Sequence, residues 1–237
     1  MEAQTIIVFG GSSGIGEATA RLAAAKGARV VIVGRNPEKL EAVRLRTPGR
    51  VVAAAVDGSD RSAVDRFFAV QGPFDHLVLS LSGSKGAGPF ASLDLAALRE
   101  GFEEKLFPQL SVAQAALPTL REGGSLTFIS ASSARSAMPG TAGLAAINAG
   151  VEAVVPVLAR ELGPTRVNAV CPGVIDTPWW ERLPREARDA FFADAIEKLP
   201  VRRVGKPEDV AAIVLSLVQN GFVTGSVFEV DGGGRLV

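Results

Sequence analysis

The sequence predicts an α/β protein with a Rossmann-type, doubly wound parallel sheet in three α/β/α layers. Short apolar runs alternate with helical patterns along the 237 residues, an order typical of parallel strands joined by crossover helices. Most of these runs are apolar at every position, as expected for strands that helices cover on both faces. The first run leads into a glycine-rich turn at 10–16 and then a helical pattern, which is the strand-turn-helix unit of such folds.

Seven strands are expected, at Thr5–Phe9, Arg29–Val33, Val51–Ala55, His76–Ser80, Ser125–Ile129, Val167–Val170 and Val227–Val230. Helices are expected near residues 15–26, 37–45, 60–70, 92–120, 141–162 and 207–219. Pro108 and Pro156 lie inside two of these helices, where a proline removes a hydrogen bond and kinks the axis. Those helices therefore either bend or have other bounds. No repeat, linker or composition shift divides the chain, which predicts a single domain over 1–237.

The composition excludes several function classes. Lys plus Arg equal Asp plus Glu at 25 each, so the overall charge favours neither a nucleic acid nor a membrane as partner. The chain begins almost directly with an apolar strand, and no apolar run approaches the roughly 18 to 20 residues of a transmembrane helix. The single cysteine, Cys171, excludes an intrachain disulfide and fits a reducing compartment. We expect a cytoplasmic protein that acts on a small molecule, and we predict no metal site.

A glycine pattern follows the first strand. Gly10-Gly11-Ser12-Ser13-Gly14-Ile15-Gly16 has the spacing Gly-x-x-x-Gly-x-Gly and opens a helix. Glycines let the backbone turn tightly and approach a pyrophosphate, while the helix N-terminus offers unpaired N–H groups and a favourable dipole. We interpret this turn as a phosphate cradle; the alternative is a glycine-rich turn without a ligand.

From end to end the chain resembles the short-chain dehydrogenase/reductase family. The segments that carry the resemblance are the glycine motif at 10–16, Val56-Asp57, and the stretches 166–173, 203–211 and 224–233. The resemblance implies a seven-stranded sheet with a nicotinamide cofactor at the carboxyl ends of its strands. It also implies that Asp57 and Gly58 hold the adenine edge, and that Gly83 lies beside the adenine ribose. The loop from Pro172 to Thr177 would contact the nicotinamide amide, with Thr177 as donor.

The residue after the second strand favours NADP(H) over NAD(H). NAD-preferring proteins end this strand with an acidic residue that binds the ribose 2′-OH, whereas this chain has Gly34 followed by Arg35. A carboxylate would repel a 2′-phosphate, but a guanidinium binds one in bidentate fashion. Ser12, Ser13 and Asn36 could add donors; the alternative is that Arg35 is a solvated loop residue. The residues predicted to contact the cofactor are Gly10, Ser12, Ser13, Gly14, Ile15, Gly16, Arg35, Asn36, Asp57, Gly58, Ser82, Gly83, Pro172, Gly173, Ile175 and Thr177.

The residues that carry the family's chemistry do not appear at their usual places. In that family a Ser and a Tyr, with a Lys four residues after the Tyr, transfer a proton beside the nicotinamide, and an Asn on the preceding helix supports them. Aligning these four positions gives, in the same order, Ala131, Leu144, Asn148 and Lys105. The chain contains no tyrosine, so no other alignment restores the usual acid. The family's Asn-Asn-Ala-Gly after the fourth strand is also missing.

Lys105 and Asn148 suggest a rearranged active site, because the family has Asn and Lys there in the reverse order. We hypothesise that the Lys105 ammonium enters the same cavity from the opposite wall as a general acid, its pKa lowered by burial near Leu144. Asn148 would hydrogen-bond the nicotinamide ribose. The alternative is a solvated lysine and a capping or core amide. Ser130 and Ser132 could donate to a substrate oxygen, although a structural hydrogen bond is the simpler role for each.

Three function classes follow. The leading one is an NADP(H)-dependent oxidoreductase with a non-standard site that reduces a small carbonyl or imine-like substrate. An imine suits a site without tyrosine, because an iminium already carries the proton that a ketone's alkoxide needs. The alternatives are an NADP(H)-binding sensor or structural partner without redox turnover, and a redox-neutral enzyme.

Aromatic residues at 179–180 and 191–192 lie in a predicted substrate lid near 176–200. They would cover an apolar or aromatic substrate, or pack against a neighbouring subunit. The family resemblance also implies that the helices near 92–120 and 141–162 form interfaces in a homodimer or homotetramer.

Overall fold

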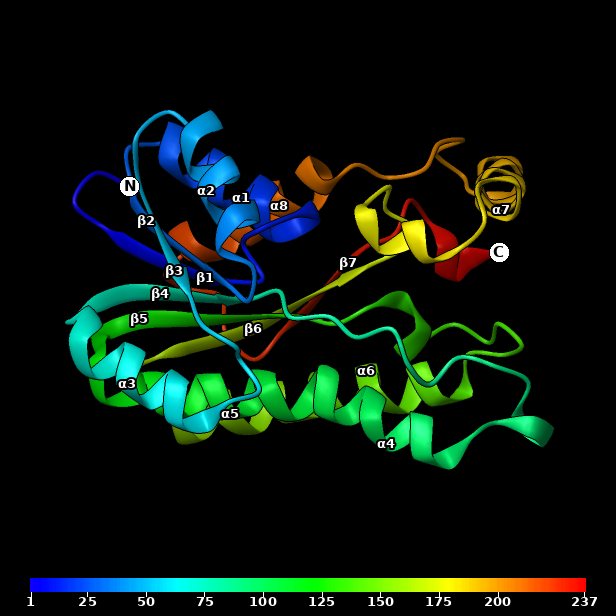
Figure 1. The fold of residues 1–237 in the computed structure, drawn as a ribbon, viewed down its shortest axis with the longest axis horizontal. Helices are drawn as coiled ribbons and strands as arrows, with labels where there is room; N and C mark the ends of the chain where they lie inside the picture. Colours follow the sequence, from blue (N-terminus) through cyan, green and yellow to red (C-terminus); the bar gives the residue numbers. More distant parts are fainter.

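The computed structural model describes residues 1–237 and contains one seven-stranded sheet between two layers of helices (Figure 1). The strand order is β3-β2-β1-β4-β5-β6-β7, and all neighbouring strands are parallel. The strands are β1 Thr5–Phe9, β2 Arg29–Gly34, β3 Arg50–Ala55, β4 Phe74–Leu79, β5 Leu120–Ile129, β6 Arg166–Pro172 and β7 Val227–Val230. The Rossmann-type prediction is confirmed. The chain reverses its direction across the sheet between β1 and β4, which is where ligands bind in open α/β sheets.

The helices divide between the two faces of the sheet. They are α1 Gly14–Ala25, α2 Pro37–Arg46, α3 Arg61–Gln71, α4 Leu95–Glu104, α5 Leu106–Ala116, α6 Ala142–Glu161, α7 Arg185–Lys198 and α8 Pro207–Gln219. Helices α1, α2 and α8 cover one face, and α3, α5 and α6 cover the other (Figure 1). Each layer encloses a cluster of 20 buried apolar residues, which explains why the strands are apolar at nearly every position.

The helix predicted over 92–120 is wrong as a single element, because it breaks at Lys105. The backbone of Lys105 has φ −128° and ψ −63°, so α4 ends at Glu104 and α5 begins at Leu106. Pro108 is therefore the third residue of α5, in the first turn, where backbone N–H groups have no helical partner. Pro156 does lie inside α6. The sequence pattern does not predict α7, and only one residue of that helix is buried.

Helix α6 corrects the expectation that no apolar run is long enough for a membrane span. By length and composition alone, α6 is long and apolar enough to cross a membrane. In this structure it packs against β6 and α5 and buries Val151 and Val155 in the cluster beneath the sheet. One face of α6 therefore belongs to the core, and its length and apolar composition resemble those of a membrane span.

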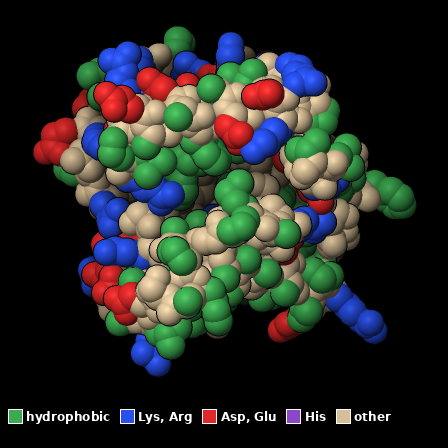
Figure 2. Space-filling view, turned by 90° about the vertical axis from the view of Figure 1, so that its right-hand side faces the viewer, with side chains coloured by type: hydrophobic (Ala, Val, Ile, Leu, Met, Phe, Trp, Pro, Cys, Tyr) green, Lys and Arg blue, Asp and Glu red, His purple; other side chains and the backbone are tan.

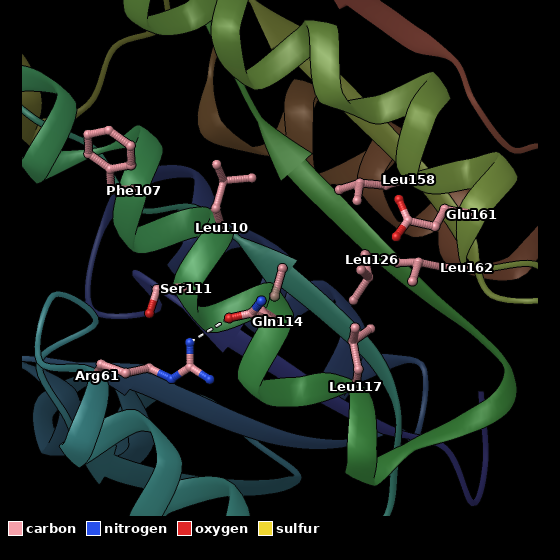
Figure 3. A pocket seen from close by; sticks show the side chains of 11 residues that line it. Arg61, Phe107, Leu110, Ser111, Gln114, Leu117, Leu126, Leu158, Glu161 and Leu162 are labelled. Carbon is pink, nitrogen blue, oxygen red and sulfur yellow. Dashed lines mark hydrogen bonds between the residues drawn. The ribbon is translucent and has the colours of Figure 1, made fainter.

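An apolar groove lies on the outer surface of α5 and α6 (Figure 3). Leu110 from α5 and Leu158 from α6 line the groove. Phe107 lies at one end of it and has 49% of its surface exposed. On another side Arg61 of α3 donates a hydrogen bond to Gln114 at 2.7 Å. These two helices therefore leave apolar surface that no other part of the chain covers.

His76 lies at the amino-terminal end of the sheet, far from the turn that follows β1. Its Nδ1 is 2.8 Å from the hydroxyl of Ser125 and its Nε2 is 3.1 Å from the amide of Gln4. Burial lowers the pKa of His76 to about 4, with the charge of Arg166 acting in the same direction and that of Asp75 against it. The imidazole is thus neutral in the folded protein at neutral pH.

This burial predicts a pH-dependent loss of stability. Between pH 6.5 and 4 the unfolded chain binds a proton at His76 that the folded chain does not, so stability falls as the pH falls through this window. The loss amounts to about 3 kcal/mol below pH 4. We expect urea unfolding at pH 7 and pH 4.5 to give a smaller difference in His76→Asn than in the native chain. An equal difference in both proteins would contradict this.

Candidate active site

The carboxyl ends of the strands form one end of the molecule, where the turn after β1 and the loops after β4, β5 and β6 meet (Figure 1). Figure 2 looks onto this end, and its surface is hollowed between the two helix layers. Most of the residues predicted to bind or act lie in these loops. Arg35 and Asn36 follow β2, Asp57 and Gly58 follow β3, and Asn148 lies in the second turn of α6.

The glycine turn is closed by contacts that only glycine permits. Gly10 has φ +79°, and a Cβ there would overlap the carbonyl oxygen of Ser80. A Cβ on Gly16 would overlap the carbonyl oxygen of Gly10, closer than real side chains approach. Ser13 caps α1 with extended backbone and makes no side-chain hydrogen bond to the helix. The first N–H groups of α1 are therefore free for an anion.

Arg35 follows β2 directly, is exposed, and forms no hydrogen bond or ion pair. Across from it, burial would raise the pKa of Asp57, but hydrogen bonds from the N–H and hydroxyl of Ser59 and the charge of Arg35 lower it below its ordinary value. The oxygen of Asn36 accepts the N–H of Lys39 at 2.7 Å as the cap of α2. Only the amino group of Asn36 is left for a ligand. Arg35 is therefore the free cation at this end of β2.

Two more of the predicted ligand residues line this crevice through close packing. A Cβ on Gly58 would come within 2.9 Å of the Leu81 side chain. A Cβ on Gly83 would come within 2.7 Å of Glu104, whose carboxylate accepts the N–H of Ser84 at 2.6 Å. The loop after β4 is thus tied to the end of α4, while the neighbouring Ser82 is exposed.

The loop after β6 returns over the glycine turn. The methyl group of Thr177 lies 3.3 Å from the place a Cβ on Gly14 would occupy. The loop is held from beneath by a bridge between Ile175 and Gly205. Gly173 passes so near Asp231 that a Cβ would come within 2.7 Å of its Cα. The structure therefore brings Thr177 next to the glycine turn, whereas its predicted contact with a nicotinamide amide stays a prediction.

Lys105 is buried, with 8% of its surface exposed. The break between α4 and α5 directs its side chain toward the end of β5, where Nζ donates a hydrogen bond to the carbonyl oxygen of Ser130 at 3.1 Å. Burial lowers the pKa of Lys105 to about 8, and the acidic group of Glu152 acts in the opposite direction. The structure thus contradicts the alternative of a solvated helix lysine.

Asn148 is also buried, with 4% exposed. Its amino group donates to the hydroxyl of Ser133 at 3.1 Å and to the carbonyl of Leu144 at 2.9 Å. Its Oδ1 is buried without a hydrogen-bond partner. A buried acceptor without a donor costs stability, so Asn148 Oδ1 lacks a hydrogen-bond donor that a ligand could supply.

The serines after β5 differ in how they are used. Ser130 is 2% exposed, and its hydroxyl donates a hydrogen bond to Glu152 at 2.8 Å. The hydroxyl proton of Ser130 is therefore already used within the protein. Ser132 begins a short turn at Ser132–Ala134 and its hydroxyl has no protein partner. Ser133, which the sequence analysis does not single out, supports Asn148. Of the two predicted serines, Ser132 is the one free to donate.

Glu152 and Arg135 are further site residues that the sequence analysis misses. Glu152 accepts from Ser130 and also from Arg135 Nε at 2.8 Å, and Arg135 reaches Glu229 at 2.9 Å. One signal was available in the sequence. Glu152 lies four residues after Asn148 on α6, and that spacing puts both on one face of the helix.

The predicted lid is a short helical turn at Pro178–Arg182 followed by α7. Trp179 donates its indole N–H to the carbonyl of Gly83 at 2.8 Å, and the Arg182 guanidinium lies 3.1 Å from the centre of the Trp179 ring. Trp180 packs against Phe191 and Phe192, with ring centres 4.9 and 5.5 Å away. The aromatic residues therefore form a small core of their own, a role that neither reading of the sequence includes.

Comparisons with known proteins extend over nearly the whole chain. The family described as Enoyl-(Acyl carrier protein) reductase matches residues 10–234. The 3-oxoacyl-[acyl-carrier-protein] reductase FabG of Thermotoga maritima is 32% identical over 251 residues, which cover 98% of this chain and 98% of that protein. Cis-4-hydroxycyclohexanecarboxylate dehydrogenase of Sinomonas cyclohexanicum is 35% identical over 242 residues, with coverage of 96% and 94%. The crystal structure of a small-chain dehydrogenase in complex with NADPH has a TM-score of 0.86 and 32% identity, and 99% of each chain is covered.

Proposed function

Because the chain belongs to the short-chain dehydrogenase/reductase family, we propose that it is an NADP(H)-dependent oxidoreductase with a non-standard active site. The substrate is a small carbonyl or imine-like compound. The observation that carries the proposal is the buried Lys105, whose ammonium faces the end of β5 where the family's serine and tyrosine would act.

The residues at the carboxyl ends of the strands fit NADP(H). The glycine turn leaves the N–H groups of α1 free for the pyrophosphate, and Arg35 is an exposed cation without a partner, suited to a 2′-phosphate. Asp57 and Gly58 would hold the adenine, and Thr177 the nicotinamide amide. The relative in complex with NADPH supports this choice of cofactor.

When bound, the cofactor supplies a hydride. The chain's own residues must then provide the proton, because a ketone that accepts hydride becomes an alkoxide. With its pKa lowered to about 8, Lys105 holds a proton at Nζ at neutral pH and can release it readily. Ser132 would donate a hydrogen bond to the substrate oxygen. Asn148 Oδ1 has no hydrogen-bond partner and would accept a hydrogen bond from a ribose hydroxyl of the cofactor.

The preference for NADP(H) depends on Arg35. We expect Arg35→Ala to raise KM for NADPH about 10- to 100-fold, because a charge-assisted bidentate contact is lost. KM for NADH should change by less than about twofold, since NADH has no 2′-phosphate. Steady-state kinetics with both cofactors measures this. Equal losses for the two would mean that Arg35 only shapes the loop.

Consumption of NADPH across ketones, quinones and cyclic imines tests the function itself. Turnover of any of these would support a reductase. NADPH binding without consumption of any substrate would favour the alternatives, a sensor or structural partner or a redox-neutral enzyme on the same fold.

The lid from 176 to 200 would close over an apolar or aromatic substrate.

The groove on α5 and α6 supports a homodimer or homotetramer. It is apolar, lies on the outer surface of the molecule, and has Phe107 half exposed at its end. Such a surface favours association with a second copy. Sedimentation equilibrium that returned the mass of a monomer would refute this.

We also propose a cytoplasmic location, because the single cysteine, Cys171, is free and buried and fits a reducing compartment.

A further inference from the structure

A chain of polar contacts connects Lys105 with the surface. Lys105 Nζ donates to the carbonyl of Ser130 at 3.1 Å, and the hydroxyl of the same serine donates to Glu152 at 2.8 Å. The other oxygen of Glu152 accepts from Arg135 Nε at 2.8 Å. The Glu152 side chain is 10% exposed and that of Arg135 is 41% exposed. This series of contacts thus connects the buried amine of Lys105, through the nearly buried carboxylate of Glu152, with the solvated guanidinium of Arg135.

We propose that Glu152 is a positioning residue for Lys105. Its carboxylate fixes Ser130, whose carbonyl holds the ammonium, and its negative charge keeps that ammonium protonated at neutral pH. The inference rests on the proposed function only where it takes Lys105 to be the proton donor. The effect of Glu152 on the charge of Lys105 is independent of it.

Three parts of the fold contribute groups that face Lys105: the loop after β5 with Ser130, α6 with Glu152 and β6 with Cys171. A negative charge on either Cys171 or Glu152 would stabilise the ammonium. Burial raises the pKa of the Cys171 thiol to about 12, so this thiol is neutral while Lys105 titrates. Glu152 is then the anion that acts on Lys105, and Arg135 partly offsets its charge.

Two variants separate this role from a structural one. Both Glu152→Gln and Arg135→Gln break the same ion pair, so a purely structural role predicts similar effects. A role in charging Lys105 predicts that only the loss of Glu152 lowers the pH at which Lys105 titrates. Glu152→Gln should move the alkaline limb of the pH profile of kcat to lower pH by roughly one unit. Arg135→Gln should leave it in place or move it upward. Glu122→Gln, an exposed carboxylate at the other end of β5, is the matched control.

A second readout does not need turnover. In protein labelled with ¹³C-lysine, the Cε signal that is lost in Lys105→Met identifies Lys105, and its shift can be followed against pH. The midpoint should fall in Glu152→Gln and stay unchanged in Glu122→Gln. An unchanged midpoint in Glu152→Gln, or a fall in both Glu152→Gln and Arg135→Gln, would overturn the inference. If the midpoint falls but Lys105→Met still turns over, the inference stands and the proposed role of Lys105 fails.

Discussion

Replacing Lys105 is expected to abolish ketone reduction while NADPH still binds. General acid catalysis contributes about 100-fold or more to a rate, and the chain has no tyrosine to take over. Lys105→Met suits the test best, because an apolar side chain of similar length fills the buried space that Lys105→Ala would leave empty. We expect kcat to fall at least about 100-fold, with the dissociation constant for NADPH nearly unchanged.

The substrate decides how to interpret the result. A cyclic iminium already carries its proton, so its reduction should lose far less in Lys105→Met than that of a ketone does. Equal losses for both would indicate that Lys105 orients the substrate rather than protonating it. Full activity toward ketones in the variant would remove Lys105 from the mechanism. Circular dichroism of the variant checks that the fold is intact.

Gly16→Ala is expected to weaken NADPH binding by at least about 100-fold, which corresponds to about 3 kcal/mol. A Cβ on Gly16 would overlap the carbonyl oxygen of Gly10, and that oxygen belongs to backbone that cannot move without opening the turn. The start of α1 would shift away from the end of β1, and the free N–H groups would no longer converge on a phosphate. Fluorescence titration with NADPH measures the change.

A matched control comes from Gly221. Nothing lies within 4 Å of a Cβ at this position, and its backbone does not require a positive φ. Gly221→Ala should bind NADPH as the native chain does. Thermal unfolding of both variants separates lost binding from lost folding. Native affinity in Gly16→Ala would mean that the turn tolerates the displacement and that the phosphate is held elsewhere.

The sequence predicts those parts of the fold that local chemistry determines. The alternation of apolar runs predicts six of the seven strands to within two residues at each end, because burial on both faces leaves a direct signature. It misses the first five residues of β5, Leu120–Gly124, which carry charged and glycine residues. Positive φ at Gly10 and Gly14 likewise follows from the glycine pattern. The proposed exchange of lysine for asparagine at Lys105 and Asn148 comes from the sequence alone; the structure adds that both residues are buried.

Other features depend on contacts between distant segments. Pro108 indicates a bend or another boundary in this stretch, but nothing local places the break at Lys105, because Glu103, Glu104 and Leu106 are all good helix formers. Arg135 and Glu152 meet only once α6 packs beside the loop after β5. Helix α7 has a weak apolar pattern because it touches little of the core. In each of these cases tertiary packing overrides or replaces the local signal.

The two tryptophans lie side by side in the helical turn Pro178–Arg182, with ring centres 4.8 Å apart, and the chain has no tyrosine. Intrinsic emission of this protein therefore comes from one short segment. The indole of Trp179 is hydrogen-bonded to Gly83 in the loop after β4 and stacked under Arg182, so separation of that segment from the loop changes its surroundings at once. The protein therefore carries a built-in optical reporter of the contact between this segment and the loop after β4.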